Sequence, residues 1–530
     1  MATAFESRSG FNSKYGFLQT RWFALKFVFA IAALCESSGL STSACAREIS
    51  FSILHTTDLH GRVLPTTDQD GNTEVGGLMR LASAIEEIRK EQPHTLLIDC
   101  GDFIQGSPET FYTQGRITFQ AMRWLNYDAV VIGNHEFDWG PEFLQDLNGE
   151  SQLPLLAANI VAQPKAPNPL EAAKPYVIKF INGAKVAIIG LTTPAMPSWF
   201  RPEYLEELHF ENPVDTVRRV LPEIREQRPD IIICAAHMGF PAMGYQKRAN
   251  RIDEVARAFP EIQLFIGGHT HRMIENLDVH GTPYTQAGHF GVWLGKVDVR
   301  FDNVTKTLIE MKPTMIKVGD RFPVHPGLEK EVAPGLKLSR ERLAEVFGEA
   351  KEDIPYTLNA AGESPMQQIL CESIGKAVKA DMVLHGLLSH DHGFQKGPIT
   401  EQDLWNVVPY DNRIGVALLT KRDLVAILEE NLVMRGRHHF MGTLGLSYTV
   451  KPDAEKGKRI INMKDADGKT LHSRKRYRVA MNSYVLASGG GRFPGLRQII
   501  DEPISRLELT KVYTRDALRD WVKKEKIIEP

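Results

Sequence analysis

The sequence predicts an α/β fold for the first half of the chain, in which short buried strands alternate with amphipathic helices. Short apolar runs rich in branched residues recur in this half, as in strands that a parallel sheet buries on both faces. Five of these runs end in clusters of aspartate, asparagine or histidine, most of them beside glycine. Because ligands bind beyond the carboxyl ends of strands in open α/β sheets, we expect one sheet edge to gather the five clusters.

The expected strands and helices follow one another along the chain. The apolar runs that end in polar clusters occupy residues 53–54, 96–98, 130–132, 231–233 and 264–266. Two more apolar runs predict strands at 186–189 and 297–299. Helical spacing of apolar residues, or an Asn-Pro start, predicts helices at 76–90, 212–225 and 251–259. Since 530 residues are too many for one ordinary core, we expect at least two domains.

The polar clusters offer a mixed set of oxygen and nitrogen donors and no thiolate. The candidate metal ligands are Asp58, His60, Asp102, Asn134, His237, His269 and His271. This composition suits Zn, Mn or Fe, and disfavours both thiolate sites and all-oxygen calcium sites. Seven donors exceed one tetrahedral ion but suit two ions that share a carboxylate. A lone buried histidine is more often a core residue than a ligand, so the prediction depends on the recurrence of the clusters at strand ends.

Three sequence blocks resemble the secreted 5′-nucleotidase branch of the calcineurin-like metallophosphoesterases. The blocks are residues 55–61, 101–107 and 133–138, which read HTTDLHG, GDFIQGS and GNHEFD. The resemblance implies a four-layer αββα sandwich at 47–312. It also implies one ion held by Asp58, His60, Asp102 and His271, and a second held by Asp102, Asn134, His237 and His269.

The resemblance further implies a catalytic pair of His135 and Asp138, with Asn134 also contacting the substrate. A hydroxide between the two ions would attack the phosphate. Metal binding lowers the pKa of water from about 15.7 to about 7, which corresponds to roughly 12 kcal/mol. A general base contributes roughly 3–5 kcal/mol. We therefore expect the ions to contribute more than His135, which would stabilise charge on the phosphoryl oxygens or assist the leaving group.

The last third of the chain resembles the α+β carboxy-terminal domain of the same family, predicted at 354–530 after a linker at 313–353. The matching blocks are residues 397–400, 408–412 and 487–493. The resemblance implies that Tyr410 and Phe493 sandwich the nucleobase, whereas the alternative is that both rings are core residues. The family's Asn-Gly-Gly-x-x-Arg block is replaced here by residues 384–392, so its phosphate-binding arginine is missing. Candidate substitutes are Arg413 and Arg492. His385, His390 and His392 are either phosphate contacts or simple loop residues.

The amino terminus predicts a secretory signal peptide at 1–46. Basic residues precede an apolar run at 27–35 that is too short to span a bilayer, and Ala44-Cys45-Ala46 offers small residues for cleavage. A disordered extension or a lipid anchor at Cys45 is the alternative. We expect a periplasmic or extracellular protein, without a disulfide framework because only three cysteines follow the leader.

These observations favour a secreted two-metal phosphohydrolase that acts on nucleotides, with nucleoside 5′-monophosphates as the first candidates. Cyclic nucleotides or UDP-sugars are alternative substrates for the same site. A non-catalytic nucleotide-binding protein is a further alternative. The net charge of −2 gives no electrostatic reason to expect a nucleic-acid polymer as partner.

Overall fold

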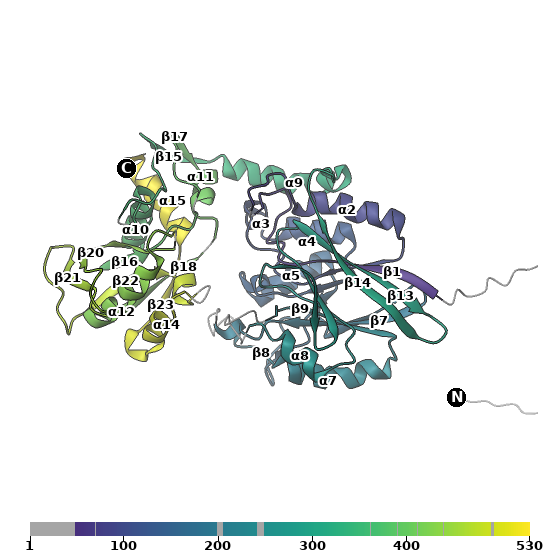
Figure 1. The fold of residues 1–530 in the computed structure, drawn as a ribbon. Helices are drawn as coiled ribbons and strands as arrows, with labels where there is room; N and C mark the ends of the chain where they lie inside the picture. The colour runs from purple at the N-terminus through teal and green to yellow at the C-terminus, as the bar shows by residue number, and fades with distance from the viewer. Residues whose placement is uncertain are drawn as a thin grey trace, which may run out of the picture.

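The structure is a computed structural model that describes residues 48–68, 70–198, 205–240, 249–360, 362–389, 391–410, 412–437, 439–488 and 492–529 (Figure 1). The predicted signal peptide at 1–46 lies outside these residues. None of the helices in the described ranges combines the length and apolar character that a bilayer crossing requires.

Two six-stranded sheets form the core of the first domain. The first has the order β14-β13-β1-β2-β3-β4, with β1 Glu48–Thr56, β2 Thr95–Asp99, β3 Ala129–Val131, β4 Leu155–Leu156, β13 Trp293–Asp302 and β14 Thr307–Lys317. The second has the order β11-β12-β10-β9-β7-β6, with β6 Tyr176–Ile181, β7 Ala184–Thr192, β9 Ile231–His237, β10 Leu264–Ile266, β11 Met273–Val279 and β12 Thr282–Ala287. The central strands β1 to β4 are parallel to one another, as are β7, β9, β10 and β12.

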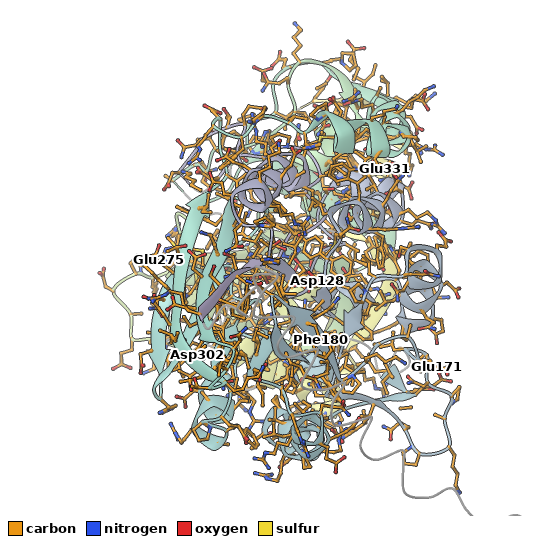
Figure 2. All side chains as sticks on the ribbon, turned by 90° about the vertical axis from the view of Figure 1, so that its right-hand side faces the viewer. Asp128, Glu171, Phe180, Glu275, Asp302 and Glu331 are labelled. Carbon is orange, nitrogen blue, oxygen red and sulfur yellow. The ribbon has the colours of Figure 1, made fainter. Side chains whose placement is uncertain are left out.

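The two sheets pack face to face, because the branched residues of both central strand sets share one buried cluster. Ile53 and Ile98 of the first sheet lie in the same cluster as Ile188, Ile233 and Ile266 of the second. At the outer rim, Lys179 of β6 pairs with Asp128 ahead of β3 at 3.0 Å, and the neighbouring Phe180 is 77% exposed (Figure 2).

Helices cover the outer face of each sheet and complete the predicted αββα layers. The first sheet is covered by α2 Gly77–Glu91, α4 Arg116–Leu125 and α5 Pro141–Ser151, and α3 Pro108–Tyr112 lies beside α4. The second sheet is covered by α7 Pro213–Glu226 and α8 Ile252–Ala258. Helix α7 begins where the sequence predicts, because the Asn212 side chain caps it by accepting from the amide of Val214 at 2.9 Å. A small separate ribbon pairs β5 Ile160–Ala162 with β8 Leu208–Phe210.

The strands and helices predicted from the sequence are all present, but the expectation of a single sheet edge is wrong. The clusters after β1, β2 and β3 belong to the first sheet, whereas those at β9 and β10 belong to the second. Parallel pairing orients the carboxyl ends of the central strands of each sheet the same way, and face-to-face packing then brings the two edges together.

The second domain is built on a five-stranded sheet of order β19-β16-β22-β18-β23. These strands are β16 Met382–His385, β18 Arg413–Thr420, β19 Gly442–Leu444, β22 Arg476–Asn482 and β23 Glu508–Tyr513. A three-stranded sheet joins β15 Val346–Ala350, β17 Gly397–Thr400 and β24 Ile527–Ile528, and a ribbon joins β20 Leu446–Val450 to β21 Ile460–Asp465. The helices are α10 Pro365–Val378, α11 Glu401–Val407, α12 Lys421–Asn431, α13 Ser483–Leu486, α14 Pro494–Asp501 and α15 Thr514–Glu525.

Helix α9 (Pro326–Leu343) leads from the first domain to β15 of the second (Figure 1). The structure ends β14 at Lys317 and begins β15 at Val346. The predicted domain limits of 47–312 and 354–530 stay predictions.

A side-chain network also joins the domains directly. The hydroxyl of Tyr112, at the end of α3, donates to Glu401 at 2.6 Å, and Arg519 of α15 donates to both oxygens of the same carboxylate at 2.6 and 2.7 Å. Helix α3 follows the predicted ligand Asp102 closely in sequence. The network therefore ties the second domain to the helix that follows the Asp102 loop.

Candidate metal centre

The structure brings all seven predicted ligands together at the adjoining edges of the two sheets. Asp58, His60, Asp102 and Asn134 lie in the loops after β1, β2 and β3 of the first sheet. His237 is the last residue of β9, and the other two histidines follow β10 in the second sheet. Three groups of side chains have donor atoms within 4.8 Å of one another: Asp58, His60 and His271; His60, Asp102 and His135; and Asp102, His237 and His269.

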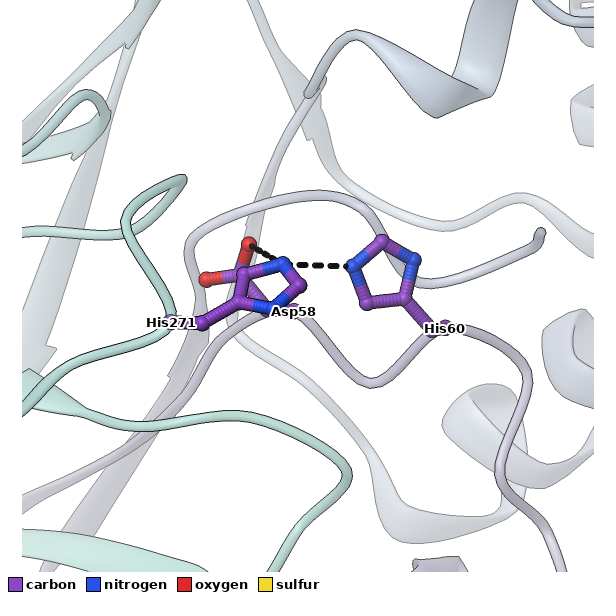
Figure 3. A group of neighbouring side chains, drawn as sticks. All are labelled: Asp58, His60 and His271. Carbon is purple, nitrogen blue, oxygen red and sulfur yellow. Dashed lines mark hydrogen bonds and ion pairs between the residues drawn. The ribbon is translucent and has the colours of Figure 1, made fainter. Parts of the chain in front are cut away.

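The first group is compact. The Nε2 atoms of His60 and His271 lie 2.9 Å apart, and His271 Nε2 lies 3.4 Å from an oxygen of Asp58 (Figure 3). Two imidazole nitrogens and a carboxylate oxygen thus point at one small volume.

The second group lies around Asp102. Nε2 of His237 is 3.1 Å from Oδ2 of Asp102 and 3.1 Å from Oδ1 of Asn134. The same Asn134 oxygen lies 3.0 Å from Nδ1 of His269. The third group links this set to His60, so Asp102 stands between the two ligand sets, where a shared carboxylate would be needed.

Backbone contacts preset the ligand orientations. Nδ1 of His60 donates to the carbonyl of Gln105 at 2.9 Å, and Nδ1 of His237 donates to the carbonyl of Cys100 at 2.7 Å. Each contact fixes the tautomer and leaves Nε2 free as a lone-pair donor, as is usual for histidine ligands.

Five of the seven candidates adopt the left-handed backbone conformation that non-glycine residues rarely adopt. The φ angles are 50° at Asp58, 47° at His60, 58° at Asp102, 69° at His269 and 56° at His271. Hydrogen bonds between loops hold this conformation: the Asp58 amide donates to Gly101 at 2.9 Å, and the His60 amide donates to Asp102 at 2.8 Å. Strained backbone conformations of this kind cost energy and persist only where the surrounding structure holds them. They are found mainly at functional sites.

Gly133 shows why glycine is needed beside the ligands. A Cβ atom at this position would lie 2.3 Å from Oδ1 of Asp102, well inside contact distance. Any side chain at residue 133 would displace the Asp102 carboxylate, so this position requires glycine.

Burial keeps three of the four candidate histidine ligands neutral. Burial lowers the pKa of His269 and of His271 to about 3, and places the pKa of His60 well below its ordinary value. These imidazoles are therefore neutral at pH 7, the form that binds metal. Burial would also lower the pKa of His237, but Asp102 outweighs burial and raises that pKa to about 9. Burial would raise the pKa of Asp102, but His237 and His135 outweigh burial and hold that pKa well below its usual range.

His135 and Asp138, which the resemblance implies are catalytic, lie in contact. Nδ1 of His135 lies 2.9 Å from Oδ2 of Asp138, and the amide of His135 donates to Oδ1 of Asp102 at 2.8 Å. The His135 ring contacts the ring of His60 edge-on, with centroids 5.2 Å apart. Burial would lower the pKa of His135, but Asp138 and Asp102 outweigh it and raise the pKa to about 10.

Glu136 is a site residue that the sequence analysis did not identify. Its fully buried carboxylate accepts four backbone hydrogen bonds, from the amides of Asp102 (2.9 Å), Phe103 (2.8 Å), Ile104 (3.3 Å) and Gly133 (2.6 Å). It therefore fixes the loops that carry Asp102 and Asn134. A glutamate next to a ligand cluster is a weak signal by itself, since only the fold reveals the four amides around it.

The two rings expected to sandwich a base differ from each other in exposure. Tyr410 is 54% exposed. Phe493 is 2% exposed and packs in the core of the second domain with Leu424, Leu486 and Leu496. In this conformation the Phe493 ring offers no free face, because apolar side chains already cover it.

The candidate substitutes for the missing arginine are engaged elsewhere. His385 is fully buried and its Nε2 accepts from Asn482 at 3.1 Å, whereas His392 contacts Asp391 at 2.7 Å. Arg413 donates to the Tyr513 hydroxyl at 3.0 Å, and Arg492 donates to that of Tyr484 at 2.9 Å. His390 lies outside the described residues.

Taken together, the donor set fits divalent metal ions. Imidazoles, an amide oxygen and carboxylates suit Zn, Mn or Fe, and among the described residues the groups able to hold a metal ion all lie in this cluster.

Comparison with known proteins assigns this arrangement to a family. The calcineurin-like phosphoesterase family matches residues 51–273, and the 5′-nucleotidase C-terminal domain matches residues 346–498. Endonuclease YhcR of Bacillus subtilis is 27% identical over 92% of this chain, which spans only 42% of the length of that relative. The 5′-nucleotidase of Vibrio cholerae is 25% identical over 90% of this chain and 92% of its own length.

A solved structure shares the fold. The 5′-nucleotidase precursor from Thermus thermophilus superposes with a TM-score of 0.67 at 22% identity, covering 91% of this chain and 97% of its own. The two matched domains occur in tandem, with the ligand cluster inside the first. The first domain therefore belongs to the calcineurin-like phosphoesterase family, and residues 346–498 belong to the 5′-nucleotidase C-terminal domain family.

Proposed function

We propose that this protein hydrolyses phosphate esters of nucleotides, with nucleoside 5′-monophosphates as preferred substrates. The observation that carries the proposal is the convergence of seven metal-ligand candidates from two sheets on Asp102, with His135 beside them. The tandem of the two matched domains supports a nucleotide as the substrate class.

The residues divide into two ligand sets. Asp58, His60, Asp102 and His271 would hold one ion, and Asp102, Asn134, His237 and His269 would hold the other. When bound, two such ions polarise the phosphoryl group and lower the pKa of water at the site. The chain itself keeps His60, His269 and His271 neutral through burial, and fixes the ligand loops through Glu136 and the backbone contacts.

His135 would act on the phosphoryl group from the edge of the ligand cluster. Asp138 accepts from Nδ1 of His135 at 2.9 Å, so the ring presents Nε2 away from Asp138. An imidazole held in this way donates a hydrogen bond to a phosphoryl oxygen or a proton to the leaving oxygen.

Tyr410 would stack on the base. Its exposed ring belongs to the second domain, and stacking on an aromatic face contributes about 1–3 kcal/mol per base in nucleic-acid binders. Phe493 could contribute a second face only after a rearrangement that removes it from the core.

A substrate panel tests the function. Purified protein loaded with Mn or Zn would be assayed on 5′-AMP, 3′-AMP, 2′,3′-cyclic AMP, UDP-glucose and p-nitrophenyl phosphate, with products separated by chromatography. We expect the highest kcat/KM for 5′-AMP. Preference for cyclic AMP or UDP-glucose would assign the alternative substrates, and adenosine binding without bound metal or turnover would indicate a binding protein.

We also propose that the chain is exported through a cleaved leader at 1–46, supported by its basic residues, short apolar run and Ala-Cys-Ala sequence. Amino-terminal sequencing of the protein from its native source tests this. A mature chain that begins near residue 47 is expected, and an intact chain that retains residue 1 would contradict export by this route.

A further inference from the structure

Arg62 lies two residues after His60 and is held rigidly to the ligand loop. Its amide donates to Leu59 at 2.9 Å, and its carbonyl accepts from Leu78 at 2.9 Å. Its guanidinium stacks on Phe290, with Cζ 4.8 Å from the ring centroid. The backbone and the aromatic ring together fix the position of this cation.

Phe290 ties the guanidinium to the proposed metal ligands. The Phe290 amide donates to the carbonyl of Asp58 at 2.9 Å, and its ring meets that of His60 edge-on at 5.9 Å. The charge of Arg62 therefore lies one aromatic ring away from the first ligand set.

The guanidinium lacks the partner that a charge in this position normally has. Its Nε atom is buried without a hydrogen-bond partner, and within the described ranges Arg62 forms no ion pair. Its charge also interacts at longer range with Glu109, with Tyr410 of the second domain and with His289. A buried donor without a partner is costly, so such a group indicates a site completed by a ligand.

We propose that Arg62 binds a phosphoryl oxygen of the substrate and takes the role of the arginine that is missing from residues 384–392. Its planar fork of donors matches the geometry of a phosphate. The phosphate would lie between the ligand cluster and Arg62, with the base extending toward Tyr410. Arg413 and Arg492 already donate to tyrosine hydroxyls, so neither is as free to take this role.

This inference rests on the proposed function for the identity of the substrate, but its test does not need a nucleotide. Orthophosphate is the probe, used as a competitive inhibitor of p-nitrophenyl phosphate hydrolysis and as a calorimetric ligand of the metal-loaded protein. Arg62→Met keeps the apolar stem against Phe290 and removes the donors, whereas Arg62→Lys keeps the charge and removes the fork. Arg123→Met, on an exposed position of α4, is the matched control.

We expect Arg62→Met to weaken orthophosphate roughly ten- to a hundredfold, with metal content and the unfolding midpoint close to those of Arg123→Met. Arg62→Lys should fall between them. An unchanged inhibition constant and calorimetric affinity in Arg62→Met would overturn the inference. So would a larger loss of phosphate affinity in Arg492→Met or Arg413→Met than in Arg62→Met.

The two failures can be told apart. If the wild type hydrolyses p-nitrophenyl phosphate but no nucleotide, the nucleotide proposal fails, while the inhibition assay still decides the role of Arg62. If the wild type hydrolyses nothing, calorimetry with orthophosphate decides it: affinity that depends on Arg62 supports the inference, and affinity that does not contradicts it.

Discussion

Asp102 and His237 meet across the two sheets, with Oδ2 of the aspartate 3.1 Å from Nε2 of the histidine. Asp102 follows β2 of the first sheet, and His237 ends β9 of the second. The other oxygen of Asp102 accepts the amide of His135 at 2.8 Å. One carboxylate thus connects both ligand sets and the proposed catalytic histidine.

Replacing Asp102 by alanine should remove both ions and essentially all phosphatase activity, because each proposed ligand set includes this carboxylate. Metal analysis by inductively coupled plasma mass spectrometry and an assay on p-nitrophenyl phosphate measure the two effects. Asp453→Ala, at an exposed position, is the control. Full metal content with wild-type activity in the Asp102 variant would make the two-metal assignment wrong.

Replacing His135 by alanine should leave both ions bound and lower kcat about a hundred- to ten-thousand-fold, the usual contribution of a positioned acid or base. The reason is that His135 lies beside the ligand sets without belonging to either. Single-turnover kinetics together with metal analysis separate the two effects. If His135→Ala loses metal as Asp102→Ala does, His135 is itself a ligand.

Replacing Glu136 by glutamine should destabilise the protein by about 1–3 kcal/mol, because an NH2 group then faces backbone amides that need an acceptor. The loop that carries Asp102 should also loosen, which weakens metal binding. Urea unfolding and metal titration measure both, with Glu150→Gln, in an exposed ion pair with Arg116, as control. Equal stability of the two variants would show that the four amides do not need the carboxylate.

Acid should destabilise the fold through two buried histidines. Burial lowers the pKa of His55 to about 3 and that of His385 to about 4, whereas an unfolded histidine has a pKa of about 6.5. Below pH 6.5 the unfolded chain therefore binds protons that the folded chain does not. Stability falls as pH falls, by up to about 1.4 kcal/mol per pH unit for each histidine.

His385→Gln isolates one of these contributions. The free energy of unfolding of the wild type minus that of this variant, measured in urea between pH 7.5 and 4.5, should shrink as pH falls. A difference that stays constant over this range would mean that His385 keeps an ordinary pKa in the folded protein.

The strands and the ligand candidates could be predicted because each cluster is local in sequence: an apolar run fixes a strand, and the polar residue after it fixes a position at the strand end. The division between two sheets could not, because strand order depends on long-range pairing. β13, for example, pairs with β1 although it follows all five clusters in sequence.

The surroundings of individual side chains also could not be predicted from local sequence patterns. Phe493 follows a glycine-rich segment as an exposed ring would, yet α12 and α14 bury it. Glu136 and Arg62 each lie close to a recognisable block. The role of Glu136 depends on four backbone amides, three of which belong to the loop after β2. The role of Arg62 depends on the ring of Phe290 and on the absence of an acidic partner in the part of the chain that the structure describes.

The most direct test of the account is anomalous scattering from crystals of the protein grown with Mn or Zn. Two peaks should flank the Asp102 carboxylate, one toward His60 and His271 and the other toward His237 and His269. A single peak, or peaks away from Asp102, would contradict the two-metal site on which the proposed hydrolysis depends.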